Sequence, residues 1–456
     1  MPFLAFLALA IAPSSDWVPA RWASNDPKSL ELVRETPVNC LLLEASLWSR
    51  EFSEAAAKAG VATLGVIPPS PDVNGLSQKA GLAGLTGIVL EGDFDAKTLP
   101  RDPPPSLTIV PLGLRSKIRF DSPASSVVGT YQGLWPGIHP EDKGTTHAAA
   151  SGSVWIDTNA GFLRFAHAAT GATMWIGNTP PPGSIYPVER YLQAIGDAAM
   201  NGARWVVALD DDLTKRVFAR DGRAVQAWRR IGRELAFYEA HKEWRSYQAF
   251  GKLALIESPQ TGALLSGGVL DMIATKHTPV RPVPSDKVTV EKFEGAQMAV
   301  DVDPESLTAG QRDALKSFTR RGGTLLTGPP GWKFPSLQLD QITLSKDDTE
   351  KLDSIWKELN SMTGRRNLGA RLFNVSTLLS NMVAPADGKQ VVLHLVNYAD
   401  YPVESLTVHL LGKYRTALLY SPELKQPLVL ELYPTDEGVG LDVDKMGVNA
   451  AIVLTP

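Results

Sequence analysis

The sequence predicts an α/β fold in which a (β/α)8 TIM barrel is followed by a flavodoxin-like α/β domain and a C-terminal β-sandwich. Three observations predict it. Short apolar runs alternate with helical patterns through the first half of the chain. A shorter alternation of the same kind begins at Gly251, and from about Arg371 strand-like segments with turn residues between them continue to the end. The chain has 456 residues, too many for one ordinary core, so several domains are expected.

The barrel is predicted over residues 16–247 by its apolar runs. Near-continuous apolar strands indicate a parallel sheet that is covered on both sides, and eight such runs in this length are typical of a closed barrel. The eight runs are 17–22, 39–44, 61–69, 87–94, 107–113, 126–133, 172–178 and 204–212.

Helical stretches lie between most of these runs. Ala59-Gly60 and Asn201-Gly202 are typical helix stops. The fourth and fifth helices are weakly marked, because Pro100 and residues 103–105 crowd that region with proline. The predicted helical stretches are 29–36, 49–60, 76–84, 161–169, 187–202 and 224–241.

The second domain is predicted over residues 248–365. GKLALIES (251–258) and AQMAVDVD (296–303) have the composition of strands, and the segment after the first of them, up to Lys276, has a helical pattern. Residues 307–331 contain a capped helix, a Gly-Gly stop and a further strand. This is the pattern of a small doubly wound α/β domain.

The third domain is predicted over residues 366–456. Alternating apolar and polar residues with turn signals between the segments indicate a β-sandwich. The predicted strands are 389–398, 405–412, 415–422, 428–434 and 449–456.

Composition excludes several functional classes. The net charge is -4 and no basic stripe is present, which argues against a nucleic-acid partner. The single Cys40 excludes disulfides within the chain and cysteine-clustered metal sites, and its setting in NCLLLE predicts a small buried hydrophobic residue.

The N-terminal segment predicts export. Residues 2–12 are almost all apolar and end in Ala10-Ile11-Ala12, so residues 1–15 have the pattern of a signal peptide and the protein is expected to be secreted or periplasmic. The alternatives are a misplaced start and a cytosolic apolar arm. No other segment is apolar enough to enter a membrane.

Carboxylates at strand ends are the candidate catalytic groups, since the active site of such a barrel lies at the C-terminal ends of its strands. Glycoside hydrolysis needs two of them at a suitable separation. Glu91 and Asp157 are the favoured pair, with Glu44 and Asp210 as alternates. For each one alone, the alternative is a helix N-cap or a salt-bridge partner.

The stretch VVGTYQGLWPGIH (127–139) predicts a sugar platform. It opens a segment, 131–159, that is expected to be a long loop at the barrel mouth, and loops of this length are usually functional or disordered. Aromatic faces beside amides suit sugar rings, so the rings are expected to be partly exposed in a cleft. The alternative is that the tryptophans only pack the loop onto the barrel. The predicted substrate-binding residues are Tyr131, Gln132, Trp135, Trp155 and Asn178.

No cofactor or metal site is predicted. His139 and His147 share the long loop with Asp157, but their spacing is not that of a tight metal site. No P-loop, dinucleotide fingerprint or nucleophile elbow is present.

The order of domains resembles that of family 42 β-galactosidases and related glycoside hydrolases. Leu307 to Leu326 is similar to their flavodoxin-like, glutamine-amidotransferase-like domain, and VVLHLVNYADYPVESLTVHL (391–410) to their C-terminal sandwich. The domain at 248–365 has no cysteine, which excludes amidotransferase chemistry. In that family the domain serves mainly assembly, so the resemblance implies a homo-oligomer.

The resemblance also implies where catalytic residues stand. Such enzymes carry Asn-Glu at the end of strand four and a Glu at the end of strand seven; here these positions are Leu90-Glu91 and Gly177-Asn178. The leading hypothesis is a glycoside hydrolase acting on an oligosaccharide or glycoside. A non-catalytic carbohydrate-binding protein on the same scaffold is the second, and an enzyme of another class is the third.

Overall fold

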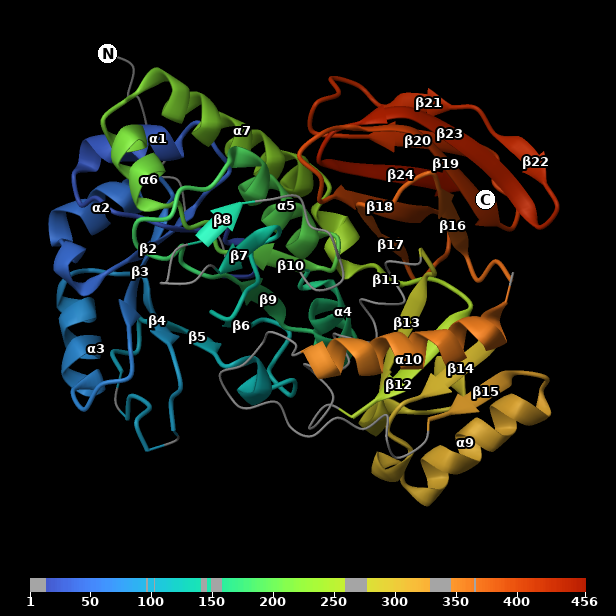
Figure 1. The fold of residues 1–456 in the computed structure, drawn as a ribbon. Helices are drawn as coiled ribbons and strands as arrows, with labels where there is room; N and C mark the ends of the chain where they lie inside the picture. The colour runs from blue at the N-terminus through green and yellow to red at the C-terminus, as the bar shows by residue number, and fades with distance from the viewer. Residues whose placement is uncertain are drawn as a thin grey trace, which may run out of the picture.

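A computed structural model describes residues 14–95, 97–101, 103–140, 146–148, 158–258, 277–328, 346–364 and 366–456. It contains an eight-stranded parallel sheet, a four-stranded parallel sheet, and a pair of antiparallel sheets with six and four strands. Figure 1 shows the barrel in blue and green, the small α/β unit in yellow and orange, and the sandwich in red. The predicted fold class is confirmed.

The eight-stranded sheet closes into a barrel. Ala20 of the first strand bridges to Val207, which follows the last strand. The Arg21 amide donates to the Val207 carbonyl at 2.8 Å, and the Val207 amide donates to the Pro19 carbonyl at 3.1 Å. Each of the eight predicted runs contains or overlaps one strand. The strands, in sheet order, are β1 (Pro19–Arg21), β2 (Cys40–Leu43), β3 (Ala62–Ile67), β4 (Gly87–Glu91), β5 (Thr108–Gly113), β6 (Val127–Thr130), β9 (Thr173–Ile176) and β10 (Ala203–Trp205).

Alternate residues of these strands fill the barrel. Cys40 is fully buried there, as the sequence predicted. Trp175 is fully buried beside it, and Trp205 is buried in the barrel's larger outer core. Because side chains alternate across a strand, the others on each strand face the surrounding helices. The interior cluster consists of Trp17, Cys40, Leu42, Ala62, Leu64, Val66, Val89, Val110, Leu112, Val127, Trp175 and Val206.

The helices around the barrel have identifiable caps. Ser49 caps α2 and Asp221 caps α7 through hydrogen bonds to backbone amides, and Gly60 and Gly202 adopt positive φ just after helices end. The helices are α1 (Leu30–Val33), α2 (Arg50–Lys58), α3 (Val73–Leu82), α4 (Ala160–Ala169), α5 (Val188–Ala199), α6 (Asp211–Phe218) and α7 (Gly222–Ala240).

One sector of the barrel wall carries no covering helix. Among the described residues no α-helix follows β4 or β5, and only a short 3-10 turn, Arg115–Lys117, lies there. A cavity of about 380 Å³ opens on the outward side, lined by Leu90, Ile109 and Val128 among others. The weak helical signal in this part of the sequence therefore reflects the fold.

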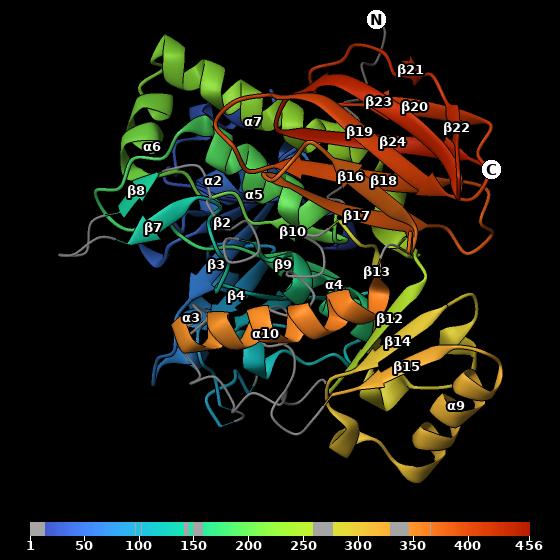
Figure 2. The ribbon, with the colours of Figure 1, turned by 45° about the vertical axis from the view of Figure 1, so that its right-hand side comes forward.

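The small α/β unit is a separate parallel sheet with helices on both faces. Leu253 and Leu255 face α10 and the barrel helix α4, whereas Ala254 and Ile256 face α9. A capping box of Thr308 and Gln311 starts α9. In sheet order the strands are β13 (Val280–Pro284), β12 (Leu253–Glu257), β14 (Met298–Asp301) and β15 (Thr324–Thr327), with α9 (Ala309–Arg320) and α10 (Lys346–Thr363), seen together in Figure 2.

The sandwich has one sheet against the barrel and one turned away from it. Trp244, Tyr247 and Met200 from the barrel side pack against residues of the six-stranded sheet. That sheet contains β11 (Gln248–Ala249), β17 (Leu378–Ala384), β18 (Val391–Asn397), β24 (Asn449–Thr455), β20 (Thr416–Tyr420) and β21 (Leu428–Leu430). The outer sheet contains β16 (Ala370–Phe373), β19 (Val403–Leu411), β23 (Gly438–Met446) and β22 (Tyr433–Thr435).

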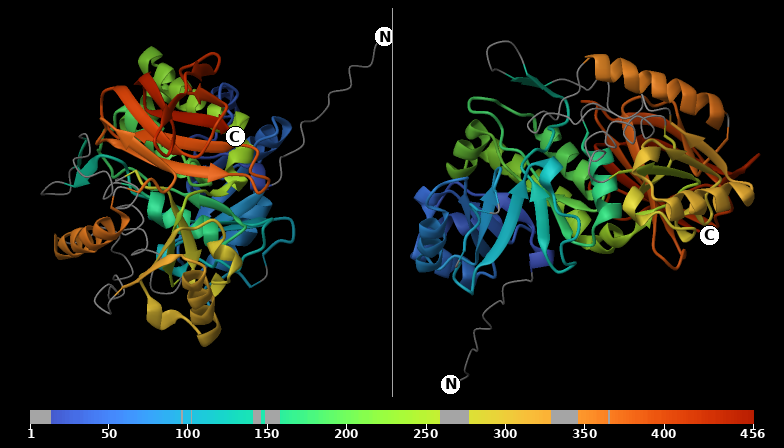
Figure 3. Two further views of the ribbon diagram at one scale, coloured as in Figure 1. Left: turned by 90° about the vertical axis from the view of Figure 1, so that its right-hand side faces the viewer. Right: turned by 90° about the horizontal axis from the view of Figure 1, so that it is seen from below.

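Polar contacts join the three units. Lys287 of the α/β unit donates to the Ala169 carbonyl at the C-terminal end of α4, where a cation is favourable. Gln193 of α5 donates to the Asn397 carbonyl at 3.0 Å, and Asn449 donates to the buried Glu234 of α7 at 2.9 Å. Figure 3 shows the α/β unit below the sandwich and both beside the barrel.

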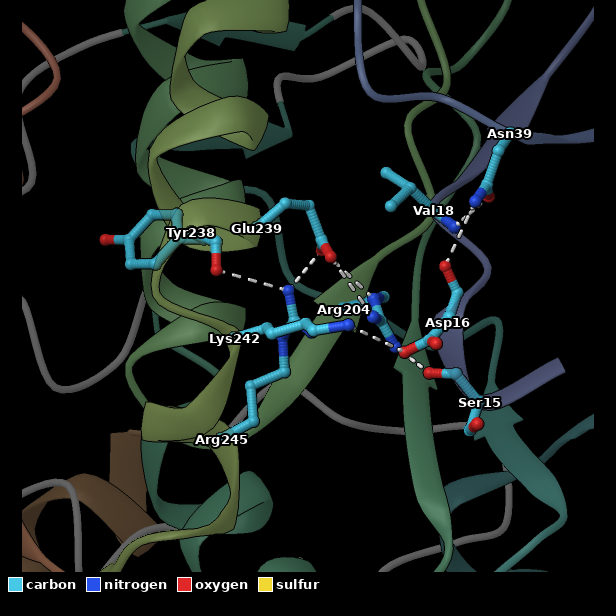
Figure 4. Close-up of polar contacts among 9 residues, drawn as sticks. All are labelled: Ser15, Asp16, Val18, Asn39, Arg204, Tyr238, Glu239, Lys242 and Arg245. Atoms are coloured by element: carbon cyan, nitrogen blue, oxygen red, sulfur yellow. Dashed lines mark hydrogen bonds and ion pairs between the residues drawn. The ribbon is translucent and has the colours of Figure 1, made fainter. Parts of the chain in front are cut away.

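The first described residues are tied to the barrel floor (Figure 4). The Ser15 carbonyl accepts from Arg204 at 2.6 Å, and Arg204 also pairs with Glu239. Burial, together with the nearby Arg204, lowers the pKa of Arg245, the other partner of Glu239, to about 10. The predicted signal peptide, 1–15, lies outside the described residues except for its last two. No helix in the described part of the chain is both long and apolar enough to cross a membrane.

Three buried carboxyl groups lie at the C-terminal edge of the α/β sheet. Glu257 ends β12, Asp301 ends β14, and Asp303 follows. Burial and the charge of Asp303 raise the pKa of Glu257. Burial raises the pKa of Asp301 to about 6, although its hydrogen bond from the Asp303 amide acts in the opposite direction.

The raised pKa of Asp301 predicts a pH-dependent stability. Between pH 3.8 and about 6 the unfolded chain has lost this proton while the folded chain retains it, so stability falls as pH rises through that window. We expect Asp301→Asn to raise the free energy of unfolding by up to about 3 kcal/mol at pH 7 and to change it little at pH 4. Urea unfolding at both pH values measures this. Asp313→Asn, at an exposed ion pair, is the matched control, and an equal effect of Asp301→Asn at both pH values would contradict the prediction.

Candidate active site

Polar residues meet where the barrel strands end. Arg21 is the last residue of β1, Glu44 directly follows β2, and Glu91 is the last residue of β4. Leu42 and Val89 belong to the interior cluster, so Glu44 and Glu91, two residues further on, continue the inward-facing series. The strands are parallel, and these ends therefore surround one mouth.

Arg21 joins the two glutamates. Its Nη1 lies 3.3 Å from Oε1 of Glu44, and its Nη2 pairs directly with Oε2 of Glu91. The side chains of Arg21 and Glu91 are 19% and 21% exposed, whereas that of Glu44 is 60% exposed. The structure thus brings together two of the predicted carboxylates through a cation that sequence reasoning missed. The available signal was an arginine at the end of the first apolar run.

The two carboxylates differ in what they can do. Glu91 is partly shielded and held by a guanidinium, so its carboxylate has a fixed position from which it can stabilise positive charge. Glu44 is bound more loosely and is largely exposed, so a ligand in the mouth can reach it. One mouth therefore offers a fixed carboxylate and an accessible one.

Asp210 has a different position. Its Oδ1 accepts from the Leu213 amide at 2.9 Å, which makes it the N-cap of α6. Its Oδ2 accepts from the Tyr191 hydroxyl at 2.7 Å and from the Tyr186 amide at 3.2 Å. Burial and the charge of Asp210 raise the pKa of Tyr191. The Asp210 carboxylate is 2% exposed, and three donors from the α5–α6 side of the barrel hold it.

Gln132 is buried and positions the loop after β5. Its Oε1 accepts from the Arg115 amide at 2.8 Å, and its backbone carbonyl accepts from the Arg115 Nε at 2.8 Å. The Arg115 guanidinium lies over the ring of Phe162, 4.6 Å from its centroid. The side-chain oxygen and the backbone carbonyl of Gln132 both bind Arg115 inside the protein, so Gln132 fixes the loop.

Asn159 connects this loop to the rest of the molecule. Its Oδ1 accepts from the Leu134 amide at 2.8 Å and also from Arg115, and its Nδ2 donates to Asp197 at 2.9 Å. Asp197 in turn accepts from the hydroxyl of Tyr398 in the sandwich at 2.6 Å. A continuous series of hydrogen bonds therefore runs from the sandwich to the barrel mouth.

Trp135 is packed into an aromatic cluster. Its ring centroid lies 5.1 Å from Tyr186, 5.3 Å from Tyr191 and 4.9 Å from Trp205, all edge to face. It is 6% exposed, so the expectation of an open platform ring is wrong for this residue. A Cβ on Gly133 would lie 2.8 Å from the Trp205 ring, so only glycine lets the loop approach so closely.

The remaining predicted platform residues have mixed positions. Tyr131 directly follows β6 and is half-buried, and Asn178 donates from Nδ2 to the Gly133 carbonyl at 2.9 Å. Trp155 and Asp157 lie outside the described residues. The segment expected to be a plain loop contains a hairpin of β7 (Ile138–Pro140) and β8 (Thr146–Ala148), in which the backbones of His139 and His147 pair. Within the described residues no group of three or more histidine, cysteine or acidic side chains could hold a metal ion.

Comparison with solved structures shows what the architecture resembles. The chain is similar to α-L-fucosidase isoenzyme 2 from Paenibacillus thiaminolyticus, with 10% identity, 96% of this chain and 99% of that chain covered, and a TM-score of 0.63. It is similar to a catalytic mutant of a family 42 β-galactosidase from G. stearothermophilus, with 9% identity, 97% and 98% coverage, and a TM-score of 0.56. A β-galactosidase from Rahnella sp. R3 matches with 9% identity, 96% and 100% coverage, and a TM-score of 0.52.

These similarities confirm the predicted family 42-like architecture over nearly the whole chain, and at such low identity they concern the fold alone. No family model matches the sequence, and a comparison with curated proteins finds no match.

The aromatic cluster predicts that Trp135 is a stability residue. Trp135→Ala would leave a cavity among three rings, and we expect it to lower the free energy of unfolding by about 3–5 kcal/mol. Phe250→Ala is the matched control because Phe250 is 38% exposed, and its effect should stay within about 1 kcal/mol. Thermal unfolding of both variants measures the difference. Equal melting temperatures for Trp135→Ala and the wild type would show that the ring is dispensable for packing.

Proposed function

We propose that this protein is a glycoside hydrolase that acts on an oligosaccharide or glycoside at the mouth of its barrel. The observation that carries the proposal is the Glu44–Arg21–Glu91 group, two carboxylates held by one guanidinium at the ends of β1, β2 and β4. The similarity to solved glycoside hydrolases supports it through the fold.

The chemistry requires two carboxyl groups on either side of the scissile bond. Their separation is about 5–5.5 Å for retention or about 6.5–9.5 Å for inversion, and the transition state carries positive charge on the sugar. In the proposed mechanism Glu91 is the fixed carboxylate that attacks the anomeric carbon, or takes the proton of the water that attacks it, while the bond from that carbon to the leaving oxygen breaks. Glu44 is the accessible group that gives a proton to the leaving oxygen. Arg21 orients both side chains without contacting the scissile bond.

Asp157 remains the alternative partner of Glu91. The sequence favours it because it lies in the segment after the sixth strand, and it falls outside the described residues. Substitution of Glu44 and Asp157 in parallel assigns the role to one of them.

A second candidate function is non-catalytic carbohydrate binding. Two observations favour it. Arg21 contacts both glutamates and neutralises part of their charge, and the seventh barrel strand is followed by Gly177-Asn178, without a carboxylate. Such a mouth could hold a sugar through hydrogen bonds while cleaving nothing.

The proposed roles predict separate effects of the two glutamates. Glu91→Gln keeps the shape and removes the charge, so kcat on a responsive aryl glycoside should fall by about 10²–10⁴ while binding is largely retained. Glu44→Gln should reduce turnover of substrates with poor leaving groups more than that of activated ones. A panel of aryl glycosides with leaving groups of different pKa measures both effects.

Asp93→Asn is the matched control, because Asp93 also follows β4 but pairs with Lys117 beside the outer cavity. Its turnover should equal that of the wild type. If the wild type binds sugars and cleaves no member of the panel, the second candidate function holds. If Glu91→Gln retains full activity, the catalytic assignment is wrong.

A further inference from the structure

We propose that the outer sheet of the sandwich carries a second saccharide-binding site, separate from the barrel mouth. The sheet of β16, β19, β23 and β22 is the layer turned away from the barrel (Figure 2). A groove of about 570 Å³ lies on it, lined by Asn367, Arg371, His409, Tyr433, Asp436 and Glu437 among others.

The groove is built on one row of paired residues across all four strands. Arg371 pairs with His409, His409 pairs with Gly440, and Gly440 pairs with Tyr433. Residues directly opposite one another across strands point to the same face. Leu372, Val408 and Leu441, one residue away on their strands, are in the sandwich core, so this row faces outward.

Gly440 is the reason that the row is concave. A Cβ on Gly440 would lie 2.2 Å from Cε2 of the Tyr433 ring, a distance at which the ring must move. Without a side chain there, the Tyr433 ring extends over the β23 backbone, and its hydroxyl lies 3.4 Å from Oδ1 of Asp442. The His409 ring stands on the other side, 6.4 Å from Tyr433 between centroids and nearly perpendicular to it.

The next row adds a second aromatic surface. Phe373 pairs with Thr407, which pairs with Asp442, and the Phe373 ring packs edge to face on His409 at 4.8 Å. Phe373 remains 40% exposed on a sheet whose other face has an ample core. Three rings in adjacent positions, with hydroxyl, guanidinium and carboxylate groups beside them, make a surface that is partly apolar and partly hydrogen-bonding.

This mixture matches a neutral saccharide. Sugar rings present apolar C–H faces to aromatic rings and present hydroxyl groups that both donate and accept hydrogen bonds. Asp436 and Glu437 outnumber Arg371 along the groove, which disfavours an acidic polymer or a nucleic acid. Carboxylates that accept from sugar hydroxyls are instead suited to an uncharged chain.

The site is independent of turnover in the barrel. It uses none of Arg21, Glu44 or Glu91, and its strands belong to a different sheet. It extends the proposed function by giving the protein a means to hold a polymer while the mouth acts on it, but it does not require that the mouth be active.

Affinity electrophoresis of the full chain tests the proposal. Native gels would contain galactomannan, xyloglucan or mixed-linkage β-glucan as neutral probes and polygalacturonate as an acidic one. We expect at least one neutral polysaccharide to retard the wild type. Tyr433→Ala should weaken binding and raise the dissociation constant roughly tenfold. Gly440→Val, which pushes against the Tyr433 ring, should act in the same direction.

The controls separate this site from the barrel. Tyr401→Ala removes a 63% exposed tyrosine of the same unit and should keep the wild-type retardation. Glu91→Gln should keep it too, while Tyr433→Ala should keep the wild-type turnover of any aryl glycoside that is cleaved.

Three results would overturn the proposal: no retardation by any neutral probe, retardation by polygalacturonate alone, or equal retardation of the wild type and Tyr433→Ala. Loss of retardation in Glu91→Gln but not in Tyr433→Ala would place polymer binding at the mouth.

Discussion

The buried carboxylate of Asp197 holds the barrel mouth, the barrel helices and the sandwich in one arrangement. It is fully buried, and it accepts from the Thr158 hydroxyl at 2.5 Å, from the Asn159 amide at 2.9 Å and from the Tyr398 hydroxyl at 2.6 Å. A buried charge of this kind is tolerated only when several donors compensate its lost hydration. Thr158 and Asn159 lie just before α4, and Tyr398 lies in the sandwich. The barrel and the sandwich therefore cannot shift relative to each other without leaving this carboxylate uncompensated.

The same hydrogen-bond network holds the loops of the barrel mouth. Asn159 accepts hydrogen bonds from Leu134 and Arg115, and Arg115 donates to Gln132. The loops after β5 and β6 therefore have fixed paths. The residues that resembled ligand-binding groups in VVGTYQGLWPGIH are therefore largely scaffold. The ionic group formed by Arg21 lies at the ends of β1, β2 and β4, outside this network, and its side chains stay partly exposed.

Sequence patterns predicted the elements whose signal is local. The eight barrel strands are apolar runs, and α9 has its own cap and stop. β17 was missed because Ser380 and Asn381 interrupt its apolar run without giving an alternation, and β13 was missed because Pro282 and Pro284 are unusual in strands. Within the site, Glu44 and Glu91 were found from their strand ends. The ion pair with Arg21 could not be predicted from the sequence, since it depends on which of several inward side chains can reach one another in a closed barrel. Nor can composition tell whether Trp135 faces a cleft or three other rings.

The sector of the barrel without covering helices has a dynamic consequence. Ile109 on the outer face of β5 is 37% exposed, whereas α5 packs on β10, and β9 and β10 are almost completely buried. Local opening costs least where few apolar contacts must be broken, so the amide hydrogens of β5 are expected to exchange with solvent through smaller fluctuations than those of β9 and β10. β5 is thus the least covered strand of the barrel wall. Glu91 lies on β4, the neighbour of β5, and Arg21 lies on the strand that closes the barrel against β10, so the ion pair between them ties the least covered part of the wall to the closure of the barrel.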